Sequence, residues 1–253
     1  MKVLVSNDDG IDAAGIIALV EELEKFAEVF VIAPLMEQSA AGHSITIKRP
    51  LKIIDFHRNN KFFGYAVDGT PADCVKIGIT TILKFKPDIV LSGINHGSNT
   101  ATNVIYSGTV SAAREALLMG ISGIAFSLDS RTSENIKDAA KIAASITRTT
   151  LLKGLNKGTF LNVNIPDLPI DEIKGIKVTR QGKAKWADSY IKKYDVIGRE
   201  FYQLTGEFNQ FDENDDDSDH LALTTGWVAV TPVKLDITDY EELESIKNWE
   251  FNF

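Results

Sequence analysis

Two adjacent carboxylates near the start of this sequence could bind a metal ion. Asp8 and Asp9 directly follow the apolar stretch 2–6, and Gly10 completes a turn signal behind them. Neighbouring carboxylates repel each other unless a cation neutralises them, and Mg²⁺ or Mn²⁺ prefers oxygen ligands of this kind. Asp and Gly also favour turns for purely local reasons. The pair alone therefore leaves a metal site and a plain turn both open.

Polar side chains also follow two other predicted strands. Ser39 and His43 come after the strand that stops at Pro34, and Asn95 and His96 come after the strand that starts at residue 88. Ligands of open parallel sheets bind outside the carboxyl ends of the strands. We therefore predict one divalent cation, Mg²⁺ or Mn²⁺, per subunit, with oxygen ligands from Asp8, Asp9, Ser39 and Asn95. The two histidines could donate protons or contact substrate, and a structural role is equally open for each.

A third polar segment begins a predicted helix. Ser107, Gly108 and Thr109 stand where the helical pattern of residues 109–119 starts. Free N–H groups and the helix dipole favour an anion at such a position, and the two hydroxyls can donate to phosphate oxygens. Ser or Thr is also a common helix cap. The two roles are compatible, so the segment is a candidate phosphate site.

The elements that position these residues alternate between strand and helix. The first three, at 2–6, 14–26 and 28–33, form a strand–helix–strand unit whose two strands should be parallel. Two extended segments, 43–57 and 61–68, are interpreted as an inserted β-hairpin. Further strands are predicted at 88–92, 122–127 and 160–163, with helices at 72–84, 109–119 and 133–151. The fold class is α/β, with a Rossmann-like, doubly wound, mostly parallel sheet.

Regular alternation fades after about residue 170. The chain is interpreted as a single domain, 1–253, with a Rossmann-like core at 1–170 and an extended C-terminal β/loop region at 171–253. Extended segments are predicted at 175–180 and 227–233. The acidic run 212–219 is interpreted as a solvated loop.

Bulk composition excludes several classes of protein. A formal net charge of -8 argues against a nucleic-acid polymer as partner, and no apolar stretch approaches the roughly 18 residues that span a bilayer. The start, 1–5, shows no signal-peptide pattern. The single cysteine, Cys74, permits no intrachain disulfide, and its neighbours suggest a buried helical position. A cytoplasmic protein is expected.

Several segments together resemble the SurE family, the stationary-phase survival nucleotidases. They are VLVSNDDGIDAAGI at 3–16, SAAGHSITIKRPL at 39–51, YAVDGTPADCVKIGI at 65–79, PDIVLSGINHGSN at 87–99, YSGTVSAAREALLMGI at 106–121, LNVNIP at 161–166 and DHLALTTGWVAVTPVKLDIT at 219–238. They occur in order and span nearly the whole chain.

The resemblance implies divalent-metal-dependent release of phosphate from nucleoside 5′- and 3′-monophosphates, and from short polyphosphate in some members. It implies a C-terminal extension that exchanges between subunits, in a homodimer or homotetramer. Carried over to this chain, the metal ligands are Asp8, Asp9, Ser39 and Asn95, with Asp8, Asp9 and Asn95 also catalytic. Ser107, Gly108 and Thr109 match the phosphate-proximal segment, and Asn99, His43 and His96 are further candidate substrate contacts.

This sequence departs from the family pattern at three places. Asp12 and Ala14 stand where His and Pro are common, Leu35-Met36 replaces an acidic–basic pair, and 100–103 replaces a loop that usually contains Gly and Asp. None of these positions is a proposed metal ligand. Because the loop at 100–103 lies beside the predicted site, base and sugar preference are the properties that transfer least directly.

Two other classes of protein share parts of the pattern. A receiver-like, Mg²⁺-binding phosphoacceptor module also begins with a strand that ends in paired acids, but it needs a further Asp where this chain has Asn95. A dinucleotide-dependent oxidoreductase would need a G-x-G-x-x-G segment after the first strand, and none is present. Within the phosphatase hypothesis, Asp8 or Asp9 could act as a covalent nucleophile, and the general acid could be His96, His43 or a metal-bound water.

Overall fold

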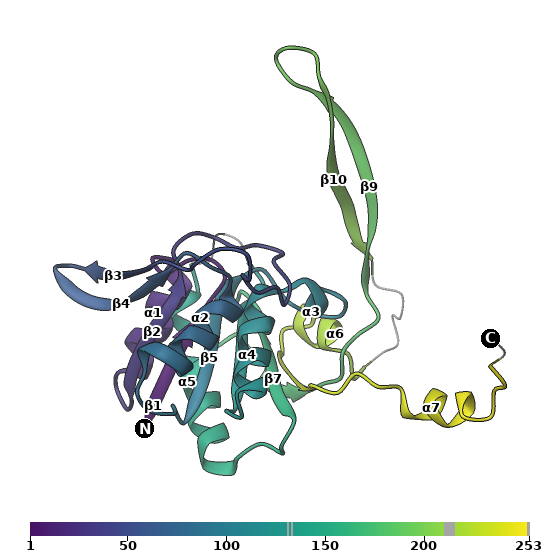
Figure 1. The fold of residues 1–253 in the computed structure, drawn as a ribbon. Coiled ribbons are helices and arrows are strands. Elements are labelled where there is room, and N and C mark those ends of the chain that lie inside the picture. Colours follow the sequence, from purple (N-terminus) through teal and green to yellow (C-terminus); the bar gives the residue numbers. More distant parts are fainter. Residues whose placement is uncertain (131, 133, 210–215, 252–253) are drawn as a thin grey trace.

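A nine-stranded sheet forms the centre of the computed structural model, which describes all residues except 131, 133, 210–215 and 252–253 (Figure 1). The strands lie in the order β3-β4-β2-β1-β5-β6-β7-β11-β8. Their bounds are Lys2–Ser6 (β1), Glu28–Pro34 (β2), Ile53–Arg58 (β3), Lys61–Val67 (β4), Ile89–His96 (β5), Gly123–Leu128 (β6), Thr159–Ile165 (β7), Ile176–Val178 (β8) and Val228–Lys234 (β11). Neighbours pair in parallel except β3 with β4 and β11 with β7. The predicted doubly wound α/β class is confirmed.

Helices cover both faces of this sheet. Helices α1 (Ala14–Leu23) and α5 (Ile136–Lys153) share one apolar cluster with Val3 and Val5 of β1. Helices α2 (Pro71–Ile77) and α4 (Gly108–Leu118) share the other with Leu4. Because side chains alternate along a strand, the all-apolar run of β1 supplies both clusters. Such a run is typical of a strand buried on both faces.

Several predicted boundaries are corrected by the structure. Residues 43–52, predicted as the start of a hairpin strand, form a loop, and only Ile53–Arg58 pairs with Lys61–Val67. Backbone groups of the loop bond to other elements instead, since the Thr46 N–H donates to the Asp73 carboxylate at 3.0 Å. The helix predicted at 72–84 ends at Ile77 and continues as one π-turn, Gly78–Ile82. Cys74 is buried and unpaired, as predicted.

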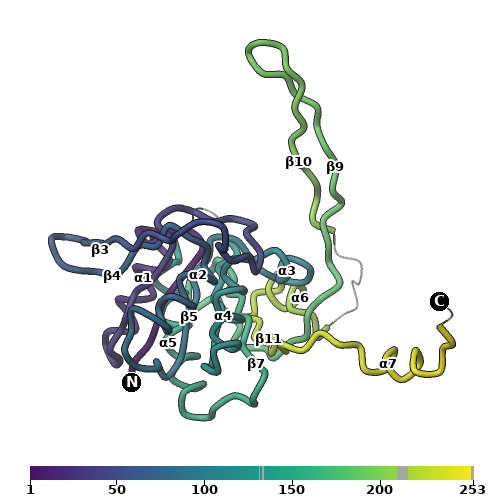
Figure 2. The backbone as a smooth tube through the Cα atoms, viewed as in Figure 1, coloured from purple at the N-terminus to yellow at the C-terminus, as the bar shows by residue number. Residues whose placement is uncertain are grey.

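The C-terminal region contains a long two-stranded arm that the sequence did not predict in this form. Among the described residues, strands β9 (Lys185–Tyr194) and β10 (Glu200–Asn209) pair only with each other, and they project away from the sheet (Figure 1). The part of the chain that the structure describes also contains three short helices: α3 (Asn103–Tyr106), α6 (Asp219–Thr224) and α7 (Tyr240–Ile246). Helix α7 lies far from the N-terminus at β1 (Figure 2).

The acidic run at 212–219 is partly outside the described residues, which resume at 216. Asp216 and Asp217 are exposed, in agreement with a solvated loop, but Asp219 is completely buried. The prediction is therefore wrong at Asp219, whose carboxylate accepts backbone hydrogen bonds inside the protein. Among the described residues, no helix has the length and apolar content needed to cross a bilayer.

Candidate active site

Asp8 is a buried carboxylate at the carboxyl end of β1. Only 5% of its surface is exposed, and the Thr109 hydroxyl of α4 donates a hydrogen bond to it. Burial raises the pKa of Asp8 to about 6, and the negative charge of Asp9 acts in the same direction, whereas the bond from Thr109 opposes the shift. The structure thus brings the acidic turn and the start of α4, predicted separately, into direct contact.

Gly108 lets the start of α4 approach Asp8 closely. A Cβ atom at this position would lie 2.8 Å from the Asp8 Cβ and 2.9 Å from Oδ2. Ser107 caps the helix by accepting a bond from the Val110 N–H at 3.1 Å, so its own hydroxyl proton stays available to a ligand. Thr109 donates its proton to Asp8, so in this arrangement it positions the carboxylate.

Asp9 faces the end of the neighbouring strand β5. Its Oδ2 accepts the His96 N–H at 3.2 Å and lies 3.4 Å from His96 Nδ1. The pKa of His96 is raised by the interaction of its ring with the Asp9 carboxylate and by the negative charge of Asp9, against the opposing effect of burial. The Asn95 amide donates to the Gly97 carbonyl at 2.6 Å, which leaves its carbonyl oxygen to accept from, or ligate, another group.

Ser39 lies in the loop that follows β2. The loop is tied to the acidic turn by the Gln38 N–H, which donates to the Asp8 carbonyl at 2.8 Å. The Ser39 hydroxyl itself donates to the Glu37 carboxylate. Ser39 therefore lies at the same edge of the sheet as Asp8, and the hydroxyl oxygen that donates its proton to Glu37 keeps lone pairs with which to ligate a cation. Glu37 was not among the residues predicted for the site.

His43 is held by the buried carboxylate of Glu115, which was not among the predicted site residues either. Its Nε2 lies 2.9 Å from Oε2 of Glu115, whose other oxygen lies 2.6 Å from the Lys76 ammonium. Burial raises the pKa of Glu115, but hydrogen bonds and charges from His43 and Lys76 lower it overall. The loop is fastened to α4 a second time by the Ser111 hydroxyl, which donates to the Gly42 carbonyl. This placement makes His43 an anchor of the loop.

Asn99 is a buried residue of the loop that follows β5. Its amide donates to the Ser127 hydroxyl at 2.8 Å, and its N–H and carbonyl bond to Asn164 and Asn162. The side chain predicted as a phosphate contact therefore holds the loop on the ends of β6 and β7.

The donor set fits a hard divalent cation. Among the described residues, no three His, Cys, Asp or Glu side chains cluster as a metal site, and Asp8 takes part in no ion pair. A buried carboxylate beside a second carboxylate carries an uncompensated negative charge. Two carboxylates with amide and hydroxyl oxygens of Asn95 and Ser39 match the all-oxygen preference of Mg²⁺ and Mn²⁺.

The fold and this edge define a Rossmann-like α/β protein with an acidic, helix-flanked ligand site at the carboxyl ends of its parallel strands. The family model described as "Survival protein SurE" matches residues 3–188. The chain belongs to the SurE family.

Similar proteins cover nearly the whole chain. It is 43% identical to the 5′-nucleotidase SurE of Chlorobaculum tepidum over 247 residues, which is 98% of this chain and 94% of the relative. It is 47% identical to the 5′-nucleotidase SurE of Geotalea daltonii, with 99% of both chains covered. The crystal structure of the SurE protein from Aquifex aeolicus matches with a TM-score of 0.85 and 43% identity over 98% of each chain.

Proposed function

We propose that this chain is a 5′-nucleotidase, a phosphoric monoester hydrolase that releases phosphate from nucleoside monophosphates with a divalent metal ion. The observation that carries the proposal is the contact between buried Asp8, which lacks an ionic partner among the described residues, and the start of α4. A cation beside Asp8 would neutralise the carboxylates, and the helix start would face the phosphate. The names of the relatives support this activity.

The proposed metal ligands are Asp8, Asp9, Ser39 and Asn95, one ion per subunit, either Mg²⁺ or Mn²⁺. A bound ion would supply Lewis acidity toward the phosphoryl group and would lower the pKa of a water molecule at the site. Thr109 fixes the Asp8 carboxylate. The Ser107 hydroxyl binds phosphate oxygens and, together with the positive end of the α4 dipole, stabilises the charge that develops on them.

His96 is the proposed acid that protonates the leaving ribose oxygen. The Asp9 carboxylate holds its ring and raises its pKa, so the protonated form persists to higher pH than for a free imidazole. His43 is the weaker candidate because its Nε2 is engaged by Glu115.

The finer substrate assignment follows the family resemblance. We propose hydrolysis of both 5′- and 3′-monophosphates, with short-chain polyphosphate as a further substrate. The departure at 100–103 lies next to the site, so base preference is the property most open to change. Cytoplasmic location is part of the same proposal and agrees with the unpaired Cys74.

The test measures phosphate release from a panel of nucleoside 5′- and 3′-monophosphates and short polyphosphate, with EDTA, Mg²⁺ or Mn²⁺. Wild type is compared with Asp9→Asn and with Asp12→Asn, a matched control at an exposed position of the same turn. Release that depends on metal, collapses in Asp9→Asn and survives in Asp12→Asn supports the proposal. A folded wild type that binds Mn²⁺ but turns over none of these substrates contradicts it and favours the receiver-like module.

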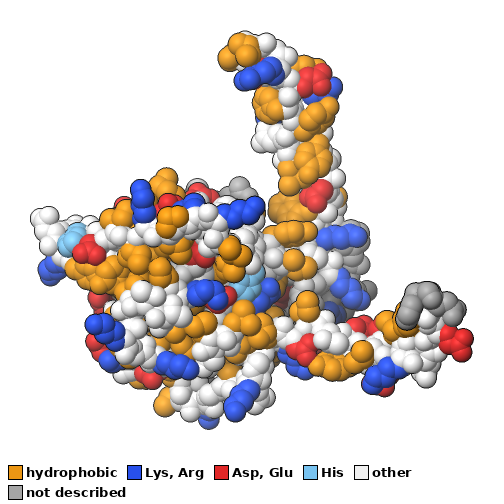
Figure 3. All heavy atoms as spheres, viewed as in Figure 1, with side chains coloured by type: hydrophobic (Ala, Val, Ile, Leu, Met, Phe, Trp, Pro, Cys, Tyr) orange, Lys and Arg blue, Asp and Glu red, His pale blue; other side chains and the backbone are white. Residues whose placement is uncertain are grey.

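The second part of the proposal concerns assembly into a homodimer or homotetramer through residues 171–253. Helix α7 buries none of its residues, and apolar side chains gather along the arm and the C-terminal tail (235–251) (Figure 3). An isolated helix of this length is not stable in water. The tail and the arm therefore need another surface to cover them.

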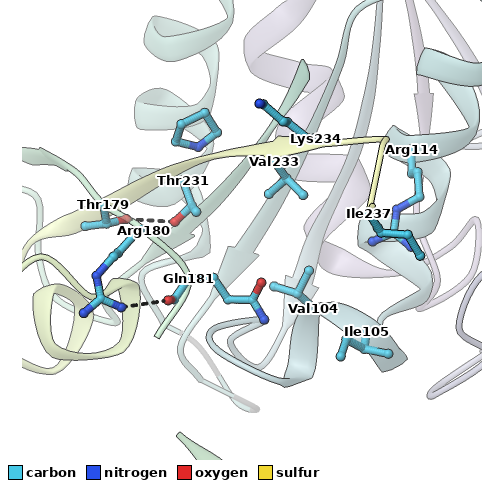
Figure 4. A pocket seen from close by; sticks show the side chains of 11 residues that line it. Val104, Ile105, Arg114, Thr179, Arg180, Gln181, Thr231, Val233, Lys234 and Ile237 are labelled. Atoms are coloured by element: carbon cyan, nitrogen blue, oxygen red, sulfur yellow. Dashed lines mark hydrogen bonds between the residues drawn. The ribbon is translucent and has the colours of Figure 1, made fainter. Parts of the chain in front are cut away.

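A groove of about 430 Å³ beside α3 and β11 is the proposed receptor for the tail of a second copy (Figure 4). Val104, Ile105 and Val233 provide apolar walls, and Arg114, Arg180 and Lys234 provide positive charge along it. Helix α7 offers complementary chemistry, with Glu241 and Glu242 in its first turn and Leu243 behind them. The groove contains none of the proposed metal ligands, so docking there leaves the acidic turn open.

A further inference from the structure

One loop connects the two halves of the candidate active site. Residues 97–102 run from Asn95 and His96 at the end of β5 to α3, which leads directly into Ser107 and α4. Any shift of this loop changes the spacing between the metal-ligating end of β5 and the phosphate-binding start of α4. What holds the loop therefore sets the geometry of the site.

The carboxylate of Asp219 holds this loop from below. Both of its oxygens accept the Ala101 N–H, at 3.2 and 3.0 Å, and Oδ1 also accepts the Gly182 N–H at 2.9 Å and the His220 N–H at 2.8 Å. Asp219 is completely buried. A buried charge is costly in free energy. Backbone N–H groups from three separate segments of the chain offset this cost here, which indicates that the carboxylate is held in one defined position.

Ala101 has a backbone conformation that needs such support. Its φ of 50° lies in the left-handed region, which residues other than glycine adopt only at a cost in free energy. Its N–H is bound by Asp219, and its carbonyl accepts the Gln181 amide at 3.0 Å. Both polar groups of this one strained residue are thus fixed by the C-terminal region.

The base of the arm joins the same network. The Thr102 hydroxyl donates to the Ala184 carbonyl at 3.0 Å, and the Trp186 indole N–H donates to the Asn103 side chain at 2.8 Å. Next to Asp219, His220 lies with its Nδ1 3.3 Å from the Thr100 hydroxyl. Residues 99–103 are therefore clamped from the N-terminal core by Asn162 and Asn164 and from the C-terminal region by Asp219 and its neighbours.

We propose that Asp219 is a positioning residue for catalysis: it fixes residues 97–103, so that the phosphate-binding Ser107 keeps its place beside the metal-ligating end of β5. This inference rests on the proposed nucleotidase function and assigns the C-terminal region a role inside each subunit. Asp219 contacts neither the proposed metal ligands nor Ser107 directly, so it acts only through the loop.

The test compares Asp219→Asn with Asp217→Asn, the same substitution at an exposed position two residues away. In Asp219→Asn, one acceptor oxygen becomes an amide donor that faces N–H groups. We expect faster hydrogen exchange across 97–103, a KM or a dissociation constant for nucleoside monophosphate raised about tenfold, and kcat within about twofold of wild type. Mn²⁺ affinity, measured by titration calorimetry, should stay unchanged. Asp217→Asn should behave as wild type in each assay.

A second variant, Gln181→Ala, removes the bond to the Ala101 carbonyl without touching a charge, and should raise KM in the same direction by a smaller factor. Unchanged exchange of 97–103 in Asp219→Asn would overturn the proposal, as would a loosened loop with unchanged substrate affinity. If wild type releases no phosphate, the nucleotidase proposal fails by itself. The exchange rates and the dissociation constant of the monophosphate still decide whether Asp219 positions the site.

Discussion

In the part of the chain that the structure describes, the strand-end site lacks a counter-ion, whereas the C-terminal arm and tail lack a surface that covers their apolar side chains. At the site, Asp8 is buried next to Asp9 and has no counter-ion among the described residues. Along the arm, apolar side chains lie in solvent, with Tyr190 67% exposed and Ile197 71% exposed. Unneutralised buried charge and uncovered hydrocarbon both raise the free energy of the isolated chain. The first requires a cation and the second a protein surface, so the two regions bind partners of different chemistry.

The largest expected effect is at the buried charge. Asp8→Asn should abolish metal-dependent phosphate release, by about 10³-fold or more, because it removes the ligand that contacts α4. In EDTA the same change should stabilise the protein. Burial raises the Asp8 pKa from 3.8 to about 6, so above pH 6 the folded state carries a penalty of up to about 3 kcal/mol.

This penalty has a definite pH dependence. A carboxyl whose pKa is raised on folding binds its proton more tightly in the folded state, so its unfavourable contribution grows as pH rises from 3.8 to about 6. Urea unfolding in EDTA should therefore find Asp8→Asn more stable than wild type at pH 7.5, with the difference vanishing near pH 4. The control Asp12→Asn should match wild type at both values. A less stable Asp8→Asn at pH 7.5 would show that its charge is already compensated in the metal-free protein.

The next effect should come from the close approach of α4 to Asp8. Gly108→Ala places a methyl group 2.8 Å from the Asp8 Cβ, so the helix start or the carboxylate must shift. A displacement of this size should reduce kcat/KM about 100-fold, while the unfolding midpoint changes little. Leu118→Ala, at an exposed position of the same helix, should retain activity. Full activity of Gly108→Ala would mean that the contact with Asp8 is not part of the catalytic geometry.

The arm is expected to control assembly and to leave the core intact. Asp188 pairs with Gly206, so residues 189–205 can be replaced by Asn-Gly, which forms a two-residue hairpin turn. The shortened chain keeps the contacts of Trp186 and should fold, because the residues removed are exposed or partly exposed. Light scattering should show a smaller assembly than for wild type. If the number of subunits is unchanged, the tail and its groove remain as the contact between subunits.

The same contrast explains what could be predicted from the sequence. The core strands are apolar runs with turn signals at their ends, so the strand-end rule placed the acidic turn and Asn95 at one edge, where β1 and β5 end side by side. The start of α4 was predicted as a phosphate site on its own, and only the structure brings it against Asp8. The loop at 43–52 alternates like a strand, yet its backbone bonds to Asp73, a tertiary contact that no local pattern reveals.

The arm and the hidden carboxylates were missed for related reasons. Side chains of β9 are exposed on both faces, so the strand lacks the buried stripe from which strands are usually predicted. Glu115 and Asp219 look like surface acids in the sequence. Their burial depends on donors from distant segments: His43 and Lys76 for Glu115, and backbone N–H groups for Asp219. Patterns along the chain reveal periodicity and helix caps, but they do not reveal which donors from distant segments meet at a given carboxylate.

The smallest expected effect tests whether the two regions are linked. Trp186→Phe removes the 2.8 Å bond to Asn103 while keeping an aromatic ring against Phe208. The loss of one exposed hydrogen bond should raise KM for nucleoside monophosphate about two- to threefold, with kcat and oligomeric mass unchanged. Tyr190→Phe, at an exposed position further along β9, should leave KM unchanged. An unchanged KM in Trp186→Phe would separate the arm from the site and leave Asp219 as the connection between the C-terminal region and the loop. An increase beyond tenfold would mean that the arm's base positions the loop as strongly as Asp219.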